Sequence, residues 1–318
     1  MSDFPQIATV TLNAALDQTA QVANFRAGEV NRVESDQSDA GGKGVNVASF
    51  LAQFGHPVAA TGLLGQSNVQ PFEKLFGDKG IIDRFVKVPG QTRVNVKIVD
   101  PQQNSVTDIN FPGLRAGNRD VEAVSAAIDG LAADGVERFV LAGSLPRGMS
   151  TDIYRLLIER LKARGRSVIL DTSGIPLDRA LAAGPDVIKP NIDELQELTR
   201  TELHGHTGIV AAARSLSAGR IGLVVVSMGA RGALFVTSDR AILAVPPKAV
   251  VKSTVGAGDA MVAGIAHGQM TGLSLPETAR IATGFSLGAL GQIGPYLPPR
   301  AEIEAFAAQV TITELNAK

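Results

Sequence analysis

The run Ser253-Thr254-Val255-Gly256-Ala257-Gly258-Asp259 joins an extended segment to a helical pattern that begins at Asp259. Two glycines one residue apart remove the Cβ atoms that would keep a ligand away from the main chain. The freed N–H groups and the positive end of the following helix predict an anion-binding turn. Asp259 stands at its rim, where a carboxylate can accept a proton from an attacking hydroxyl. A tight turn with an acidic residue in the first helical turn is the alternative interpretation of this segment alone.

Around this run, short β-rich segments alternate with amphipathic helical patterns over most of the 318 residues. Near-continuous apolar strands separated by helices predict an α/β fold, with a mostly parallel central sheet flanked by helices on both faces. The predicted strands lie at residues 7–12, 138–141, 167–171, 186–189 and 223–226.

Ligands of such sheets bind at the carboxyl ends of the strands. Polar residues follow the predicted strands at that position, as Asn13 and Asp17, Gly143-Ser144, Asp171-Thr172, Lys189-Pro190-Asn191 and Ser227. One of the helices between these strands is expected to bury a face made of Ile153, Leu156, Leu157 and Leu161.

Two polar stretches, residues 19–38 and 92–111, interrupt this alternation. Strict alternation, as in Arg93-Val94-Asn95-Val96-Lys97-Ile98, predicts a sheet with one wet face. Such a sheet is either a flap over the site or a surface hairpin without function. No repeat at a period of 20–50 residues is present, so we expect a single domain over residues 1–318.

The composition excludes several classes of partner and chemistry. The 30 basic and 31 acidic residues give a net charge of −1 without a long basic run, which argues against nucleic acid or an anionic membrane surface. The absence of cysteine excludes disulfides, thiolate catalysis and cysteine-based zinc sites. No secretory signal opens the sequence and no apolar run reaches the roughly 18 residues of a membrane span, so we expect a cytoplasmic protein.

A second glycine-rich run, Gly41-Gly42-Lys43-Gly44-Val45-Asn46, opens the first amphipathic helix. It fits neither a P-loop nor the G-x-G-x-x-G dinucleotide pattern. Its glycines allow close approach of a ligand, and Lys43 supplies a point charge suited to a phosphate. Asn46 lies three residues further on and faces the same way. A glycine-rich helix start with a solvated lysine is the alternative.

Two further pairs have both a structural and a functional interpretation. Asn13 and Asp17 can bind vicinal sugar hydroxyls or cap a turn. Asn191 and Glu194 have the spacing of a capping box at the start of a helix. The functional interpretation requires Glu194 to orient a metal-bound water near nucleotide phosphates.

Together these motifs resemble the ribokinase-like (PfkB) carbohydrate kinases over nearly the whole chain. The matching segments are Ser253-Thr254-Val255-Gly256-Ala257-Gly258-Asp259, Gly41-Gly42-Lys43-Gly44-Val45-Asn46-Val47-Ala48, Gly143-Ser144-Leu145-Pro146, Asp171-Thr172-Ser173-Gly174, Lys189-Pro190-Asn191-x-x-Glu194 and Ser227-Met228-Gly229. The resemblance implies a ribokinase-like fold with a small β-sheet lid formed by residues 19–38 and 92–111. It also implies ATP as co-substrate, Mg²⁺ as cofactor, a sugar phosphate as acceptor and a homodimer formed through the lid.

The resemblance also assigns roles to matching positions. Asp259 would be the catalytic base, and the main chain of Gly256, Ala257 and Gly258 the anion hole. The remaining implied site residues fall into four groups: Asn13, Asp17, Gly42, Asn46 and Ser144 for the sugar; Lys43 and Arg93 for the phosphate already on the substrate; Lys189, Asn191, Ser227 and Gly229, with Gly256 and Gly258, for the nucleotide; and Glu194 for Mg²⁺, through water.

Three segments are most similar to the bacterial branch of the family that phosphorylates fructose 1-phosphate, namely Thr11-Leu12-Asn13-Ala14-Ala15-Leu16-Asp17, the Gly-Gly-Lys-Gly variant and Thr107-Asp108-Ile109-Asn110-Phe111-Pro112-Gly113. Ala14 replaces the usual proline, and Ile175 replaces a frequent acidic residue. The resemblance therefore implies the conversion of fructose 1-phosphate and ATP to fructose 1,6-bisphosphate and ADP.

Alternatives remain in this branch and outside it. A tagatose-6-phosphate or fructose-6-phosphate kinase would keep every catalytic residue. A kinase of unphosphorylated sugars or nucleosides would not need the two cationic side chains, Lys43 and Arg93. A non-catalytic sugar-phosphate-binding regulator is the alternative of another class. With an ordinary carboxyl pKa near ~3.9, Asp259 would be a weak base that accepts its proton late in the transfer.

Overall fold

The structure, a computed structural model, describes residues 4–217, 219–249, 251, 253–292 and 294–315. Its larger sheet has 11 strands, and β6 (Val86–Val88) joins it by pairing with β4. The other strands follow in the spatial order β15 (Thr311–Glu314), β14 (Ala241–Val245), β13 (Ala233–Val236), β12 (Leu223–Ser227), β11 (Val187–Ile188), β10 (Ser167–Asp171), β9 (Arg138–Ala142), β1 (Ile7–Thr11), β4 (Val58–Gly65) and β5 (Ile82–Asp83). In this spatial order, the strands from β12 through β1 to β5 are parallel to one another. Strands β13, β14 and β15 pair antiparallel at the other end of the sheet.

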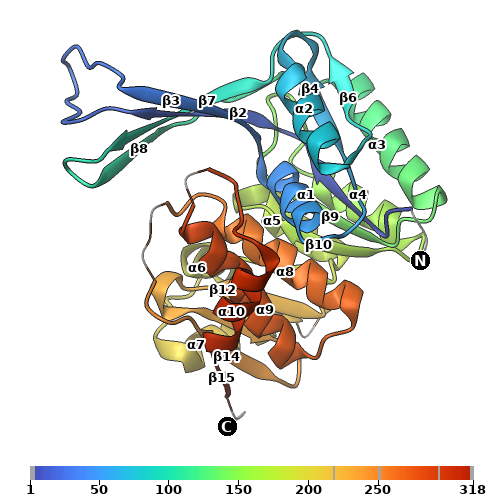
Figure 1. Ribbon diagram of the computed structural model, residues 1–318. Helices are drawn as coiled ribbons and strands as arrows, with labels where there is room; N and C mark the ends of the chain where they lie inside the picture. Colours follow the sequence, from blue (N-terminus) through green and yellow to red (C-terminus); the bar gives the residue numbers. More distant parts are fainter. Residues whose placement is uncertain (1–3, 218, 250, 252, 293, 316–318) are drawn as a thin grey trace.

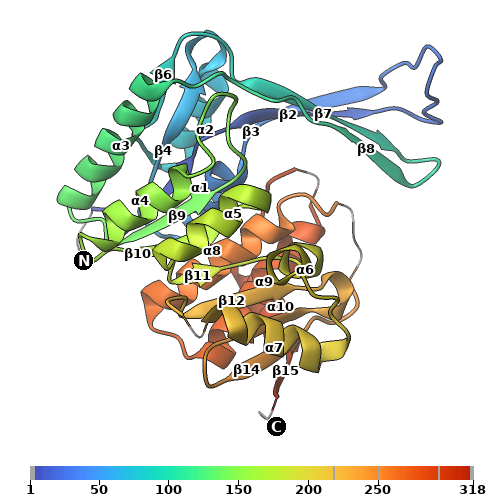
Figure 2. The ribbon, with the colours of Figure 1, turned by 180° about the vertical axis from the view of Figure 1, so that it is seen from behind.

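Helices cover both faces of this sheet (Figures 1 and 2). One apolar core lies under α1 (Lys43–Gln53), α2 (Gln70–Lys79), α8 (Ala257–Thr271), α9 (Leu275–Leu290) and α10 (Arg300–Gln309). The other lies under α3 (Asn118–Ala133), α4 (Ile153–Lys162), α5 (Gly174–Ala180), α6 (Ile192–Thr199) and α7 (Gly205–Ser217). Successive strand residues point to opposite faces, so Val140 belongs to the first core and Leu141 to the second. The predicted α/β fold class is confirmed.

The strand register brings the carboxyl ends of the central strands to one level. Thr11 of β1 and Asp171 of β10 both pair with Ala142 of β9. The residues that follow these strands therefore emerge side by side along one edge of the sheet, as expected for a parallel sheet. Short 3₁₀ turns lie at Gln66–Asn68, Leu181–Ala183 and Gly229–Arg231, and the last of these follows β12 at the same edge.

The two polar stretches form a separate four-stranded sheet in the order β3 (Ser35–Gly41), β2 (Ala15–Gln21), β7 (Arg93–Asp100) and β8 (Ser105–Ile109). It projects from the body as an arm (Figure 1). The sheet begins at Ala15, earlier than the pattern predicted, because Ala15 pairs with Gly41 and with Arg93. The outermost strand is exposed along its whole length, so the expectation of one dry face does not hold there.

The predicted buried face of α4 is wrong at Leu156, whose exposed fraction is 46%. The face that packs consists of Ile153, Tyr154, Leu157, Ile158 and Leu161. These positions make one stripe at 3.6 residues per turn, and Leu156 falls outside it. Strand β11 is also shorter than predicted, because only Val187 and Ile188 carry strand pairing. No helix in the described ranges is long and apolar enough to cross a membrane.

Candidate active site

The predicted anion-binding turn lies at the start of α8. Gly256 is the N-cap residue, and its φ of 76° places it in the left-handed region that glycine adopts without strain. Within the described part of the chain, no side chain caps this helix end. The first N–H groups of α8 therefore remain free to bind an anion, and the helix dipole favours a negative charge there.

The second glycine-rich run brings α1 to the same place. Gly42, the N-cap residue of α1, has a φ of 114°, and a Cβ built on it would lie 3.1 Å from the Cα of Ala14. The close packing against Ala14 and the positive φ both require glycine at this position. From the first turn of α1, Asn46 donates a hydrogen bond of 2.7 Å to Oδ2 of Asp259. This bond joins the starts of α1 and α8.

Asp259 is buried, with 7% of its surface exposed. Burial raises the pKa of its carboxyl to about 6, against a smaller lowering by the Lys43 ammonium. The neighbouring Asp171 charge raises this pKa further, whereas Asn46 and Lys189 lower it. Asp259 is therefore a stronger base than the ordinary carboxylate that the sequence suggested, yet most of it is ionised at neutral pH.

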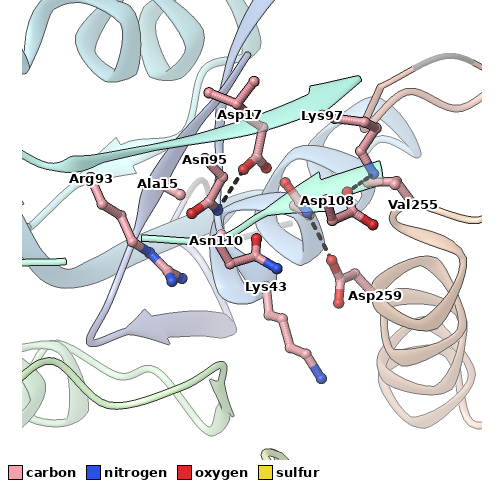
Figure 3. A pocket seen from close by; sticks show the side chains of 13 residues that line it. Ala15, Asp17, Lys43, Arg93, Asn95, Lys97, Asp108, Asn110, Val255 and Asp259 are labelled. Carbon is pink, nitrogen blue, oxygen red and sulfur yellow. Dashed lines mark hydrogen bonds and ion pairs between the residues drawn. The ribbon is translucent and has the colours of Figure 1, made fainter. Parts of the chain in front are cut away.

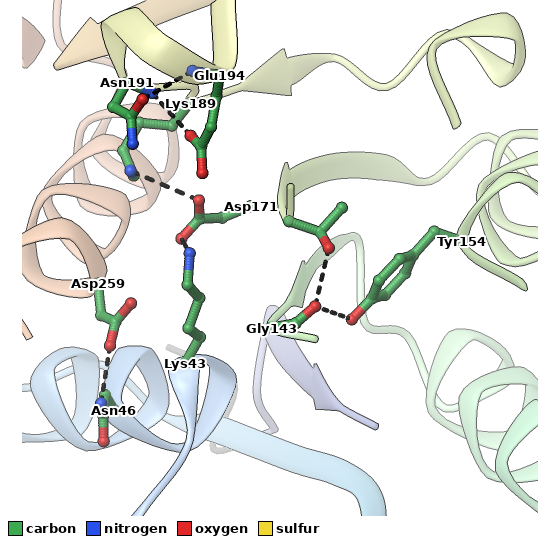
Figure 4. Close-up of polar contacts among 10 residues, drawn as sticks. Lys43, Asn46, Gly143, Tyr154, Asp171, Lys189, Asn191, Glu194 and Asp259 are labelled. Atoms are coloured by element: carbon green, nitrogen blue, oxygen red, sulfur yellow. Dashed lines mark hydrogen bonds and ion pairs between the residues drawn. The ribbon is translucent and has the colours of Figure 1, made fainter. Parts of the chain in front are cut away.

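A second buried carboxylate, Asp171, lies at the end of β10 between two lysines (Figure 4). Its Oδ2 lies 3.1 Å from Nζ of Lys43, and its Oδ1 lies 3.5 Å from Nζ of Lys189. Burial alone would raise the pKa of Asp171, but the two ammonium groups outweigh it and keep that pKa below the ordinary value. The same pairing keeps the pKa of Lys43 above its ordinary value in spite of desolvation, so this lysine is charged.

A cavity of about 260 Å³ opens between the small sheet and the starts of α1 and α8 (Figure 3). Its walls carry mostly hydrogen-bonding side chains, which suits a hydroxylated ligand. The cavity is lined by Ala15, Asp17, Gly42, Lys43, Asn46, Arg93, Asn95, Val96, Lys97, Asp108, Asn110, Val255 and Asp259.

Arg93 borders this cavity and also ties the small sheet to the end of β1. Its guanidinium donates to the main-chain carbonyls of Asn13, Ala14 and Phe111 at 3.0, 3.3 and 2.9 Å. Asn13 donates in turn to Oγ of Ser144 at 3.1 Å. The side chain of Asp17 accepts from Asn95 at 2.9 Å, and burial raises the pKa of its carboxyl.

A second cavity, of about 220 Å³, lies on the other side of the α8 turn. Its walls are largely apolar, as expected for a pocket that takes the flat face of a ligand ring. The cavity is lined by Ser227, Gly229, Gly232, Pro246, Thr254, Ala257, Gly258, Met261, Thr283, Ser286, Leu287 and Leu290. The turn at residues 254–259, which holds the free N–H groups of α8, therefore contributes residues to the walls of both cavities.

Asn191 and Glu194 form the predicted capping box at the start of α6. The Asn191 side chain accepts from the Glu194 N–H, and Oε2 of Glu194 accepts from the Asn191 N–H, both at 2.8 Å. Glu194 nevertheless acts on the site, because its charge contributes to the raised pKa of Lys43. Among the described residues, no group of three or more His, Cys, Asp and Glu side chains could hold a metal ion.

The structure thus collects the predicted residues at one edge of the sheet. Asp17, Gly42, Lys43, Asn46, Arg93 and Asp259 line the first cavity, whereas Ser227, Gly229 and Gly258 line the second. Asn13 and Ser144 contact each other. Lys43 lines the same cavity as Arg93, and its ammonium also lies against Asp171.

Four polar residues of the small sheet and its following segment line the cavity without having received a role from the sequence, and one buried carboxylate nearby received none either. Asn95 and Lys97 alternate with Arg93 along β7, so the period-2 pattern could have pointed to them. Asp108 pairs with Lys97 at 2.9 Å, and Asn110 follows the same hairpin. Asp171 begins the segment Asp171-Thr172-Ser173-Gly174, but nothing in the sequence shows that two distant lysines converge on it.

The family model for pfkB carbohydrate kinases matches residues 10–301. The chain belongs to that family. It is 53% identical over 310 residues to a 1-phosphofructokinase of Rhodobacter capsulatus, covering 98% of each chain. It is 36% identical over 312 residues to a 1-phosphofructokinase of Escherichia coli K12, covering 98% of this chain and 99% of that one.

Among solved structures of similar fold is phosphofructokinase-2 from Escherichia coli in complex with substrates and products. The TM-score is 0.90 at 28% identity, and the match covers 95% of this chain and 98% of the other. The family membership agrees with two cavities that share one helix N-terminus in their walls, since a carbohydrate kinase brings two substrates to one transfer point.

Because a protonated Asp259 cannot accept a proton, we expect kcat/KM to fall below a pH of about 6, roughly tenfold for each further pH unit. The rate should be flat from there to neutral pH. Initial rates at low substrate concentration between pH 4.5 and 8 measure this acid side of the pH–rate profile. A fall in kcat/KM that begins only near pH 4 would show that burial does not perturb the pKa of this carboxyl.

Asp259→Asn should lower kcat by roughly 10²–10⁴ with little change in KM, because proton acceptance occurs only during transfer. The variant should also be more stable at pH 7.5, by up to about 3 kcal/mol, since the raised pKa of Asp259 means that its ionisation opposes folding. This gain should disappear as the pH falls through about 6 towards 4.

Turnover assays and thermal unfolding at pH 7.5 and pH 4.5 test both parts of this prediction. The exposed Asp78→Asn variant on α2 is the matched control, and it should change neither quantity. Near-native turnover of Asp259→Asn would show that Asp259 is not the catalytic base.

Proposed function

We propose that this protein transfers the terminal phosphoryl group of ATP to fructose 1-phosphate, giving fructose 1,6-bisphosphate and ADP. The observation that carries the proposal is the position of Asp259. It is a buried carboxylate with a raised pKa, between a polar cavity and an uncapped helix N-terminus. The relatives named 1-phosphofructokinase, at 53% and 36% identity over almost the whole chain, support this choice of sugar phosphate.

In the proposed step, the acceptor hydroxyl oxygen at carbon 6 forms a bond to the γ-phosphorus. The bond from that phosphorus to the bridging oxygen of ATP breaks, and ADP leaves with the electron pair. The hydroxyl proton passes to a carboxylate oxygen of Asp259. Since the transition state of phosphoryl transfer is loose, positioning and charge neutralisation supply most of the rate acceleration. The N–H groups at Ala257 and Gly258 would supply part of that neutralisation.

The other site residues take the following proposed roles. Asn13, Asp17, Gly42, Asn46 and Ser144 bind the sugar, and Lys43 and Arg93 bind the phosphate that the sugar already carries. Lys189, Asn191, Ser227 and Gly229 bind the nucleotide, together with the turn at Gly256 and Gly258. The polar walls of the first cavity and the apolar walls of the second support this division.

Glu194 is the proposed contact to Mg²⁺, through water. One oxygen of Glu194 accepts a hydrogen bond in the capping box, and both oxygens of Asp171 are paired with lysines. The protein therefore offers few carboxylate oxygens to a cation, which fits an Mg²⁺ ion held mainly by the nucleotide phosphates. When bound, Mg²⁺ would neutralise charge on the β- and γ-phosphates. The task of this chain's own residues is to orient the hydroxyl and to receive its proton.

The small sheet is the proposed lid. It supplies Asp17, Arg93 and Asn95 to the wall of the first cavity. Closing it over bound substrates would exclude water and limit the hydrolysis of ATP.

A panel of acceptors tests the proposed substrate. ADP release should show the highest kcat/KM with fructose 1-phosphate, followed by tagatose 6-phosphate and fructose 6-phosphate, all with Mg-ATP. A higher kcat/KM with tagatose 6-phosphate or fructose 6-phosphate would instead make the protein a kinase of that sugar phosphate. Failure to phosphorylate any of these sugar phosphates, together with retained binding of them, would indicate a sugar-phosphate-binding regulator instead.

Arg93→Met should raise the KM for fructose 1-phosphate at least tenfold with a smaller effect on kcat. A phosphate that does not react is bound alike in the ground and transition states, so its loss changes binding. Steady-state kinetics with the variant measure this, and circular dichroism controls for the loss of the carbonyl contacts of Arg93. A fall in kcat alone would contradict the role.

We also propose that the protein forms a homodimer through the small sheet. Apolar side chains are exposed on this sheet and on its connecting segments, where a partner would cover them. They are Val30 at 90%, Val33 at 56%, Val106 at 52%, Ile109 at 45% and Phe111 at 48% exposed. A solved structure of phosphofructokinase-2 from Escherichia coli is described as a tetrameric inhibited form, so association occurs in the family.

Light scattering after gel filtration tests the dimer. The wild-type protein should elute as a dimer, and Val106→Lys should shift it towards the monomer because a lysine charge would be buried in the interface. Leu156→Lys on α4, which is exposed to a similar degree (46% against 52%) but lies on the body, is the matched control and should leave the dimer intact. A wild-type protein that elutes as a monomer would contradict the proposed dimer.

A further inference from the structure

The small sheet is fixed to the body at a second place besides Arg93. Tyr296 belongs to the segment 294–298, which precedes α10, and its hydroxyl donates a hydrogen bond of 2.6 Å to Oδ1 of Asp39 on β3. This length is typical of the strong bonds that hydroxyls make to carboxylates. Burial and the Asp39 carboxylate raise the pKa of Tyr296 to about 12, so the hydroxyl keeps its proton at neutral pH.

Asp39 is held from two further sides. Gln37 donates its side-chain amide to both carboxylate oxygens of Asp39, at 3.0 and 2.9 Å. Gly294 packs on the same group, because a Cβ built there would lie 2.9 Å from Oδ2 of Asp39. Gly294 also has a φ of 88°, so both its conformation and this close approach require glycine. Asp39 has 9% of its surface exposed and therefore lies enclosed between the sheet and the body.

The segment 294–298 also contacts the anion-binding turn. A Cβ built on Gly256 would lie 3.8 Å from the Cα of Pro295, so the buried Pro295 packs beside the N-cap residue of α8. Further along the segment, the carbonyl of Leu297 accepts a hydrogen bond of 2.6 Å from Gln53 at the end of α1. The segment is therefore seated on the body on both sides of the tyrosine.

Asp39 lies beside a residue that borders the first cavity. Asp17 is its partner in the register of β2 and β3, and Asp17 lines that cavity. A cavity of about 40 Å³, far smaller than a ligand pocket, remains where the two carboxylates face Val255 and Pro295. The root of the small sheet, residues 15–17 and 39–41, is therefore packed closely against the turn that begins α8.

The two anchors of the small sheet lie on different strands. Arg93 on β7 bonds to the carbonyls of Asn13 and Ala14, whereas Asp39 on β3 bonds to Tyr296. Strand β2 lies between β3 and β7. One anchor alone would let the sheet rotate about it, and the second anchor restricts that rotation.

From these contacts we infer that Asp39 and Tyr296 are positioning residues that hold the root of the small sheet in register with the α8 turn. The inference rests on the proposed kinase function. The sheet carries a wall that would orient the sugar, and the turn would bind the phosphoryl group in transfer. The acceptor oxygen and the phosphorus must meet in one geometry, and a misplacement of about 1 Å can cost about 100-fold in rate.

Phosphoryl transfer and ATP hydrolysis, measured in the same variant, test this role. Tyr296→Phe removes the hydroxyl and should lower kcat with fructose 1-phosphate and Mg-ATP by about 5–30-fold. Hydrolysis of Mg-ATP without sugar should change less than about twofold, because it needs the turn but not the wall of the sheet. The ratio of transfer to hydrolysis should therefore fall. Loss of folded protein would instead lower both rates by one factor and leave the ratio unchanged.

If hydrolysis without sugar is below detection, the Kd of a non-hydrolysable ATP analogue with Mg²⁺ takes its place. This Kd should stay within about twofold of the wild-type value while kcat falls, since the nucleotide does not contact the sheet in this account. Isothermal titration calorimetry measures it.

Variants of Asp39 supply a rescue test. Asp39→Ala removes the acceptor and should lower kcat about as far as Tyr296→Phe, whereas Asp39→Asn keeps an oxygen that can accept from the tyrosine and should stay within about threefold of wild type. Adding Asp39→Ala to Tyr296→Phe should lower kcat less than about threefold further, because both changes remove the same bond.

Asp36→Ala is the matched control. Asp36 lies on the same strand as Asp39, but its carboxylate accepts from Gln18 of β2, within the sheet. Its loss removes the same charge and should change neither kcat nor the ratio of transfer to hydrolysis. Circular dichroism checks that each variant folds. If Asp39→Ala does not, Tyr296→Phe decides, because Tyr296 is 40% exposed and loses only its hydroxyl.

A folded Tyr296→Phe variant with the kcat of the wild-type protein would overturn the inference. Transfer and hydrolysis that fall by the same factor would overturn it too, and so would an analogue Kd that rises as far as kcat falls. A wild-type protein that does not phosphorylate fructose 1-phosphate would instead refute the proposed function, so the two failures are distinguishable.

Discussion

A carboxylate that is to accept a proton must carry a charge, and burial opposes that charge. At Asp259 the opposition is only partly relieved. Asn46 donates one hydrogen bond, and the ammonium groups of Lys43 and Lys189 lie nearby, so the pKa stays at about 6. The result is a group that is ionised at neutral pH and still basic enough to help a hydroxyl attack. The rest of the site can be understood as the arrangement that makes this one buried charge tolerable.

Two helix starts provide that arrangement. Gly42 and Gly256 let α1 and α8 begin close to each other, and the Asn46–Asp259 hydrogen bond fixes their relative position. The parallel strands deliver Asp171 and Lys189 to the same edge, since strand register sets where each strand ends. A backbone cradle therefore lies between the sugar-sized cavity and the apolar cavity, with two cations beside it.

Much of this could be predicted from the sequence, because it is local. Apolar strands, amphipathic helices, the Asn191–Glu194 capping box and the two glycine-rich helix starts are each specified by neighbouring residues, and the structure confirms them as elements. The direction of Lys43 was not predictable in this way, because it depends on Asp171, which is 128 residues away. The raised pKa of Asp259 was missed for the same reason, since burial is a property of the assembled core. Leu156 shows a smaller failure of the same kind, in which an apolar residue lies just outside the stripe that packs.

A crystal structure with fructose 1-phosphate and a non-hydrolysable ATP analogue tests the central claim most directly. The account predicts that the carbon-6 hydroxyl lies about 2.6–3.2 Å from a carboxylate oxygen of Asp259. The γ-phosphate should rest on the N–H groups at the start of α8. A complex in which Asp259 is out of reach of that hydroxyl, while another base contacts it, would contradict the account.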